Sequence, residues 1–132
     1  MQQDNLSFDA VLKVAKDKGF TSDQESKLDI GGYDAAHKLT ILSTLCFKSN
    51  LNFNNNHIEG ISNIKIEDIN FAKKLGYKIK LISEASIIEG KISNFTSPKL
   101  VSMDNPLASV DNALNAINIE TIHLENLFLE GE

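Results

Sequence analysis

The sequence predicts an α+β domain with a mixed, mostly antiparallel sheet and helices packed on one face. Apolar residues recur with the 3.6-residue period of helices in the first half of the chain and alternate as in strands in the second half. Helices followed by antiparallel-looking strands are typical of α+β folds. The length of 132 residues suits one domain with one core, and no linker or repeat divides residues 1–132.

Three helices are expected. Residues 7–18 place apolar side chains at i, i+3, i+4 and i+7, with Ser7 as a cap. A second helix runs from about residue 33 to 47, and its apolar positions cover more than one face, which predicts that it is well buried. The third, residues 66–76, has acidic residues at its start and lysines near its end. Residues 20–32 are polar without a clear period, and we expect a loop there.

The strands are expected after residue 60. We predict a short strand in "ISNIKI", residues 61–66. Two longer strands, residues 77–88 and 92–102, are expected to pair through a turn at 89–91. A bend at "NPLASV" separates them from two further strands, residues 112–122 and 125–132.

The composition argues against several classes of function. The formal net charge of −5 disfavours nucleic acid or an anionic membrane as a partner, because both need basic patches. No apolar stretch approaches the roughly 20 residues that span a bilayer, and the polar first residues do not resemble a signal peptide. Cys46 is the single cysteine, and its apolar neighbours predict a small buried residue. A lone cysteine fits a reducing compartment, so we expect a cytoplasmic protein.

No nucleotide or metal motif stands out in the sequence. Neither G-x-G-x-x-G nor G-x-x-x-x-G-K-[ST] occurs, so a nucleotide phosphate cannot be held by those glycine-rich loops. His57 lies near Glu59, whereas His37 and His123 are isolated. We expect each of them to be a structural or surface residue, and we predict no metal site.

The stretch "LDIGGYDAAHKLTIL", residues 28–42, carries the strongest chemical signal. Its glycine pair lets the backbone turn sharply and approach another group closely. Asp34 then falls in the first turn of the expected helix, and Lys38 lies one turn later on the same face. With Asp29 before the turn, the stretch offers two carboxylates and one ammonium to a ligand. A carboxylate pair suits a substrate amino group, and a lysine suits a hydroxyl.

The same spacing allows a plainer interpretation. An Asp–Lys pair at i, i+4 is common on exposed helices, where it contributes only about 0.3–0.5 kcal/mol. Spacing alone favours such a salt bridge over a site. The apolar character of the helix and the conformational cost of the glycine pair favour a site.

Three segments, in order, resemble the homoserine dehydrogenase family. "DIGGYDAAHKLTIL" is similar to the family signature, in which an Asp, a Gly, a "DAA" and a Lys follow at this spacing. The likeness continues through residues 59–82 and 97–120, so it covers nearly the whole chain. The resemblance implies interconversion of homoserine and aspartate semialdehyde with NAD or NADP, in threonine and methionine biosynthesis.

The resemblance also implies roles for individual residues. Lys38 matches the lysine that exchanges the proton at the hydroxyl, and Asp34 matches the aspartate beside it. Asp29 matches an aspartate that helps to hold the substrate. A family glutamate that grips the substrate ammonium has no direct counterpart in "TSDQESK"; Asp23 is the first candidate for that role and Glu25 the second. Because neighbouring carboxylates favour the ammonium form of a lysine, we expect Lys38 to donate a proton in the reductive direction.

The resemblance further implies a partial chain. The family's enzymes begin with a dinucleotide-binding domain that these residues do not include, so we expect no cofactor bound to this chain and no turnover by it alone. The family dimerises through the sheet of this domain, which makes a homodimer the expected assembly. Two alternatives stay open: a stand-alone module that binds an amino acid or a partner strand, and a purely structural domain.

Overall fold

The computed structural model describes residues 8–19, 23–111, 114–123 and 125–131. Ser7, the expected cap of the first helix, lies outside them. The elements follow the chain in this order: α1 (Phe8–Asp17), α2 (Asp23–Gly31), α3 (Tyr33–Phe47), a 3₁₀ turn (Phe53–Asn55), β1 (His57–Ile58), α4 (Ile66–Lys74), β2 (Tyr77–Ile88), β3 (Lys91–Ser102), a second 3₁₀ turn (Pro106–Ala108), β4 (Asn115–Glu120) and β5 (Asn126–Gly131).

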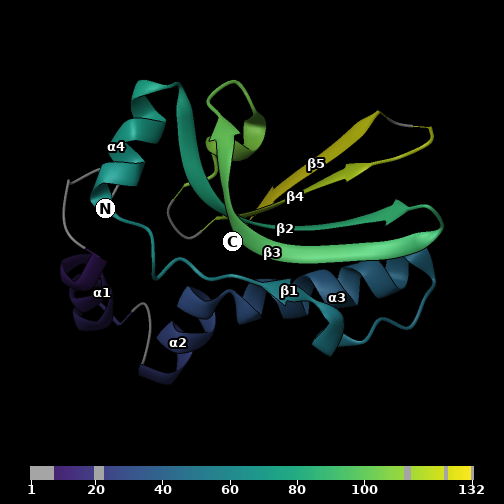
Figure 1. Ribbon diagram of the computed structural model, residues 1–132, viewed down its shortest axis with the longest axis horizontal. Coiled ribbons are helices and arrows are strands. Elements are labelled where there is room, and N and C mark those ends of the chain that lie inside the picture. The colour runs from purple at the N-terminus through teal and green to yellow at the C-terminus, as the bar shows by residue number, and fades with distance from the viewer. Residues whose placement is uncertain (1–7, 20–22, 112–113, 124, 132) are drawn as a thin grey trace.

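Two sheets organise these elements, and they confirm the α+β class. The first has the order β1-β3-β2, in which β2 and β3 are antiparallel and β1 is parallel to β3. The second is the antiparallel pair β4–β5. Figure 1 shows α3 running along one side of the curved β2–β3 hairpin, with the β4–β5 hairpin beyond its other side.

The β2–β3 hairpin is the longest continuous pairing, and its two-residue turn lies within the predicted residues 89–91, of which Lys91 already belongs to β3. The ladder runs from Tyr77 opposite Ser102 to Ile88 opposite Lys91. The two residues between the strands have positive φ, 50° at Glu89 and 75° at Gly90. This conformation is that of type I′ turns, whose twist matches the twist of paired strands.

A chain of polar side chains connects α3 to the sheet. Thr96 on β3 is fully buried, and its hydroxyl lies 2.8 Å from the hydroxyl of Ser83 on β2. On the same face, Asn94 Nδ2 donates to Asn56 Oδ1. Asn56 in turn donates from Nδ2 to Thr40 Oγ1 on α3, at 2.8 Å. Partly buried polar groups that are paired in this way favour one relative position of helix and sheet.

The opposite face of the hairpin holds the segment that leads to β4. Lys78 Nζ donates to Asp111 Oδ2 at 3.0 Å, and Lys80 Nζ donates to Asp111 Oδ1 at 2.9 Å. Lys80 also donates to the carbonyl of Val110. The hydrogen bonds from Lys80 and then Lys78 hold the pKa of Asp111 below its ordinary value of 3.8.

The lowered pKa of Asp111 predicts a pH-dependent contribution to stability. Because the folded pKa lies below the unfolded one, the contribution is complete above the unfolded pKa and disappears as pH falls through the folded pKa. We expect Asp111→Asn to lower the free energy of unfolding by no more than about 1 kcal/mol near neutral pH, because the Asp111 side chain is 38% exposed. Urea denaturation should show this difference from wild type shrinking below about pH 4. A difference that is the same at pH 3 and pH 7 would contradict it, and the exposed Asp104→Asn serves as a control.

Four expectations were wrong, two of them about secondary structure. The predicted loop at 20–32 contains α2, whose polar residues give no hydrophobic pattern although several of them favour helices. Residues 61–66 do not form a strand; the strand in this region is β1, only two residues long and defined by its pairing with β3.

The other two wrong expectations concern burial. Cys46 is exposed instead of buried. The helix α3 buries Ala36 and Ser43, but it leaves Ile41 63% and Leu45 70% exposed. An apolar pattern on a helix predicts that its surface packs against another surface. It does not show that this surface belongs to the same 132 residues.

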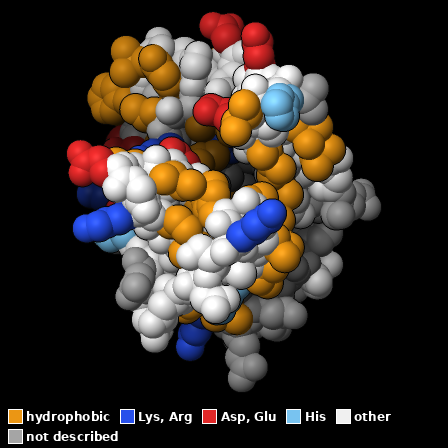
Figure 2. All heavy atoms as spheres, turned by 90° about the vertical axis from the view of Figure 1, so that its right-hand side faces the viewer, with side chains coloured by type: hydrophobic (Ala, Val, Ile, Leu, Met, Phe, Trp, Pro, Cys, Tyr) orange, Lys and Arg blue, Asp and Glu red, His pale blue; other side chains and the backbone are white. Residues whose placement is uncertain are grey.

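Large apolar side chains remain exposed on several other elements. Figure 2, which faces the right-hand end of Figure 1, shows hydrophobic side chains gathered around a hollow. Ile87 and Ile88 at the end of β2 are each 58% exposed, and Phe71 and Leu75 on α4 are 64% and 70% exposed. Exposed apolar surface of this extent is typical of faces that meet another protein surface. No helix in the described ranges is long and apolar enough to cross a membrane.

Candidate functional site

The residues of the predicted site lie at the corner between α2 and α3. Gly31 ends α2, Gly32 has a left-handed φ of 79°, and α3 begins at Tyr33. The N–H of Gly32 donates to the carbonyl of Asp29 at 3.1 Å, which closes the last turn of α2. Asp29 therefore lies just before the corner and Asp34 just after it, so the corner places one carboxylate on each helix.

The surroundings of Gly32 explain why the corner has a glycine at this position. A Cβ at this position would lie 3.2 Å from Cγ2 of Thr96 and 3.5 Å from the carbonyl oxygen of Glu59. The corner thus presses directly on β3 and on the strand segment beside it. The expectation that the glycine pair allows a close approach is confirmed.

Asp34 and Lys38 form an ion pair on the outer surface of α3. Lys38 Nζ lies 2.8 Å from Asp34 Oδ2, with the side chains 59% and 48% exposed. An exposed pair of this kind contributes little to stability. Both side chains are accessible to solvent.

The remaining candidates lie on α2. Asp29 is exposed near the C-terminal end of that helix. Asp23 is its first residue, and Glu25 follows in its first turn. The side chains of Asp23 and Glu25 lie outside what the structure describes, so their proposed contact with a substrate ammonium stays a prediction.

Two structural features near the site were missed from sequence. His37, next to Lys38, stacks on Phe53 with ring centroids 4.1 Å apart and planes 18° from parallel. Gly60 packs against the C-terminal end of α2, where a Cβ would meet the carbonyl oxygen of Ile30 at 2.2 Å. An isolated glycine between apolar residues, as in "IEGI", is the sequence signal for such a close backbone approach.

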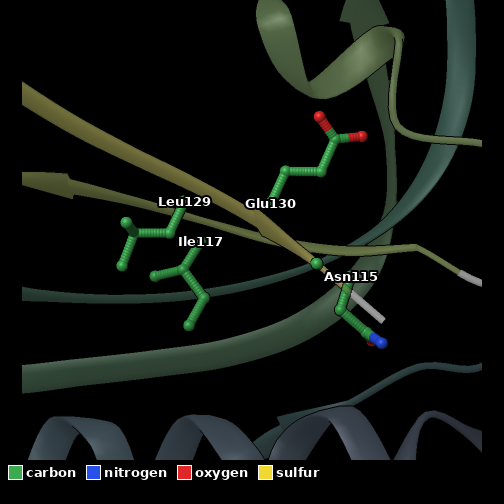
Figure 3. Close-up of a pocket in the computed structure, with 5 residues that line it drawn as sticks. Asn115, Ile117, Leu129 and Glu130 are labelled. Atoms are coloured by element: carbon green, nitrogen blue, oxygen red, sulfur yellow. The ribbon is translucent and has the colours of Figure 1, made fainter.

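A hollow found in the structure lies elsewhere, on the β4–β5 hairpin. It is lined by Asn115, Ile117, Leu129, Glu130 and Gly131. Figure 3 shows Ile117 and Leu129 pointing from this hairpin toward β2 and β3, whereas Glu130 points away from them. The hollow contains none of the predicted site residues and gives no support for substrate binding there.

Clusters of side chains that could bind a metal ion are also absent from the part of the chain that the structure describes. No cluster of three or more His, Cys, Asp or Glu side chains in these ranges is arranged to hold a metal ion. His57 lies on β1 and His123 follows β4, and both are exposed.

The fold and the corner together define an α+β domain with an Asp–Lys ion pair at the surface of the corner. Comparison with known families identifies it: the family model described as homoserine dehydrogenase matches residues 1–132. The chain belongs to the homoserine dehydrogenase family, as its sequence motifs predicted.

Individual relatives agree with this assignment. The homoserine dehydrogenase of Bacillus subtilis is 38% identical over 119 residues, which make up 90% of this chain and 27% of that protein. The Neisseria gonorrhoeae enzyme is 36% identical with the same coverage. Among solved structures, Staphylococcus aureus homoserine dehydrogenase superposes with a TM-score of 0.95 at 33% identity, over 100% of this chain and 33% of that one. The chain thus spans about a quarter to a third of the length of these relatives.

Proposed function

We propose that these residues form the substrate-binding part of a homoserine dehydrogenase. The reaction is the NAD- or NADP-dependent interconversion of L-homoserine and L-aspartate 4-semialdehyde, a step of threonine and methionine biosynthesis. The observation that carries the proposal is the α2–α3 corner, where Asp29 and Lys38 are exposed and Asp34 is partly exposed, in a chain that belongs to this family.

The charges at the corner are complementary to homoserine. The substrate carries an ammonium group, for which Asp23 is the first candidate acceptor and Glu25 the second, while Asp29 helps to hold the substrate. Its hydroxyl, or the aldehyde oxygen of the oxidised form, suits the ammonium of Lys38. The 2.8 Å contact with Asp34 limits the positions that Lys38 can take, and a positioned acid or base is what proton transfer requires.

The proton moves through Lys38. In the reductive direction, Lys38 Nζ donates a proton to the aldehyde oxygen, which becomes the hydroxyl of homoserine; in the oxidative direction, the amine accepts it back. In the complete enzyme, a bound reduced dinucleotide would supply the hydride. We expect no dinucleotide bound to this chain, whose sequence contains neither of the two glycine-rich phosphate-binding motifs.

The assembly we propose is a homodimer in the cytoplasm, without nucleic acid or membrane as partner. Within the described residues, β2 is an edge strand with β3 as its neighbour in the sheet. An exposed edge strand next to exposed apolar side chains can pair with a second copy of the same sheet. The net charge of −5 supports the exclusion of polyanionic partners.

The test is an assay of the complete gene product with homoserine and either NAD or NADP. We expect reduction of the dinucleotide that depends on homoserine, and an Asp34→Asn variant with much weaker turnover. Binding of homoserine without turnover, measured by calorimetry, would favour the stand-alone amino-acid-binding module. The absence of both binding and turnover would favour a structural domain.

Asp29 gives a prediction specific to substrate binding. Asp29→Asn removes a carboxylate charge that we propose helps to hold the substrate, and a hydrogen bond to a charged group contributes about 1.5–3 kcal/mol. We expect KM for homoserine to rise by about 10- to 100-fold while the KM for the dinucleotide stays constant. The matched control is Asp104→Asn, on an exposed turn away from the corner. Equal KM values for homoserine in the Asp29 and Asp104 variants would remove Asp29 from the site.

A further inference from the structure

Residues 59–61 form a short bridge between the sheet and the α2–α3 corner. The segment follows β1, and the N–H of Glu59 donates to the carbonyl of Thr96 on β3 at 2.8 Å. Two residues later, the N–H of Ile61 donates to the carbonyl of Ile30 in α2, also at 2.8 Å. Ile30 lies in the last turn of α2, where helix carbonyls have no partner within the helix. The bridge therefore caps α2 and ties it to β3.

Gly60 sets how closely the bridge approaches the helix. A Cβ at Gly60 would lie 2.2 Å from the carbonyl oxygen of Ile30, 2.8 Å from Cα of Gly31 and 3.0 Å from its carbonyl carbon. All three are backbone atoms, so no side chain can rotate away to make room. Any residue other than glycine must displace either the bridge or the end of α2.

The other side of the corner is fixed by the same part of the sheet. Thr96 is fully buried, and its Cγ2 is the nearest atom to the position that a Cβ of Gly32 would take. The corner is thus held between residues 59–61 and β3. Asp29 lies one residue before Ile30, and Asp34 lies two residues after Gly32. A shift of the corner changes the distance between these two carboxylates, since they stand on different helices.

We infer that Gly60, with Glu59 and Ile61, is a positioning segment that sets the spacing of Asp29 and Asp34 for an amino-acid substrate. This inference rests on the proposed function for its catalytic consequence, but its structural part stands on the backbone contacts alone. A displacement of about 1 Å at a catalytic group can cost on the order of 10²-fold in rate. Gly60→Ala is therefore expected to lower kcat/KM for homoserine by about 10- to 100-fold.

The first test is hydrogen exchange on the complete gene product, which needs no activity. In Gly60→Ala we expect faster exchange at the N–H groups of Gly32, Ala36 and Ile61, each of which donates a hydrogen bond at the corner. Exchange in the β2–β3 ladder should stay as in wild type. The matched control is Gly131→Ala, because a Cβ at Gly131 meets nothing within 4 Å. Unchanged exchange at the corner would overturn the inference.

The second test separates positioning from general damage. In Gly60→Ala we expect KM for homoserine to rise and kcat to fall, with an unchanged KM for the dinucleotide; equal changes in both KM values would overturn the inference. If Gly60→Ala does not fold, Thr96→Ser decides, because it removes the methyl group against Gly32 and keeps a hydroxyl for Ser83. Thr96→Ser should raise KM for homoserine several-fold and speed exchange at the corner, and wild-type values would overturn the inference. An inactive wild-type enzyme would refute the proposed function instead, while the exchange data would still decide the role of Gly60.

Discussion

Replacing Lys38 by alanine is expected to lower kcat of the complete enzyme by about 10²- to 10⁴-fold, the usual contribution of a positioned general acid or base. The variant loses the group that donates a proton to the aldehyde oxygen. Its effect on folding should be small, because the ion pair with Asp34 is exposed at both ends. We expect the free energy of unfolding to change by less than about 0.5 kcal/mol. A steady-state assay in both directions, with urea denaturation of the same samples, measures both quantities.

Two further variants separate proton transfer from charge. Lys38→Arg keeps a cation that can pair with Asp34, but a guanidinium does not lose its proton under ordinary conditions. We expect its kcat to fall nearly as far as in Lys38→Ala, with a smaller change in KM. Lys73→Ala on α4 removes an exposed lysine from another helix and should behave like wild type. Retention of more than a tenth of wild-type kcat by Lys38→Ala would remove Lys38 from the chemical step.

Replacing Gly32 by alanine is expected to cause a large loss of stability. An L-residue in the left-handed region costs about 1–2 kcal/mol, and Gly32 has a φ of 79°. The new Cβ would also lie 3.2 Å from Thr96 Cγ2, on a side chain that is fully buried and hydrogen-bonded to Ser83. We expect a loss of about 2 kcal/mol or more in the free energy of unfolding, measured by urea denaturation.

The chain offers a matched control for this prediction. Gly76 has a φ of 80°, but a Cβ at that position meets nothing within 4 Å. Gly76→Ala therefore reports the cost of the backbone conformation alone, and the difference between the two variants reports the contact with the sheet. Equal losses in Gly32→Ala and Gly76→Ala would mean that the corner moves away from Thr96 without cost. In that case the tight approach of the corner to β3 would not matter for stability.

The elements that sequence predicted well are those whose signals are local. The sequences of α3 and α4 have apolar residues at helical spacing. The sequence of the β2–β3 hairpin has alternating apolar residues in both strands and a glycine in the turn between them. The helix α2 carries no hydrophobic pattern, and the bridge from Ile61 at its C-terminal end comes from residues about 30 positions later. The strand β1 exists only through its partner β3. Neither the Ile61–Ile30 contact nor the β1–β3 pairing can be predicted from a short stretch of sequence.

The candidate site divides in the same way. Asp29, Asp34 and Lys38 are close in sequence, so their grouping at one corner was predictable, although their catalytic roles stay predictions. Gly60 and Thr96 reach the corner from distant parts of the chain, and their contribution needed the structure. The exposure of Cys46 shows the same limit, because an apolar sequence neighbourhood does not say which side of a helix is covered.

The β2–β3 hairpin also has a consequence for the order in which the chain folds. Its strands are joined by a two-residue turn, so pairing them closes a very short loop and costs little entropy. The corner forms its contacts only when residues 30, 60 and 96 have come together, which requires long loops to close first. The hairpin is thus suited to the folding nucleus, and the site assembles on it afterwards. Substitutions in the hairpin should then slow folding, whereas substitutions at the corner should mainly speed unfolding.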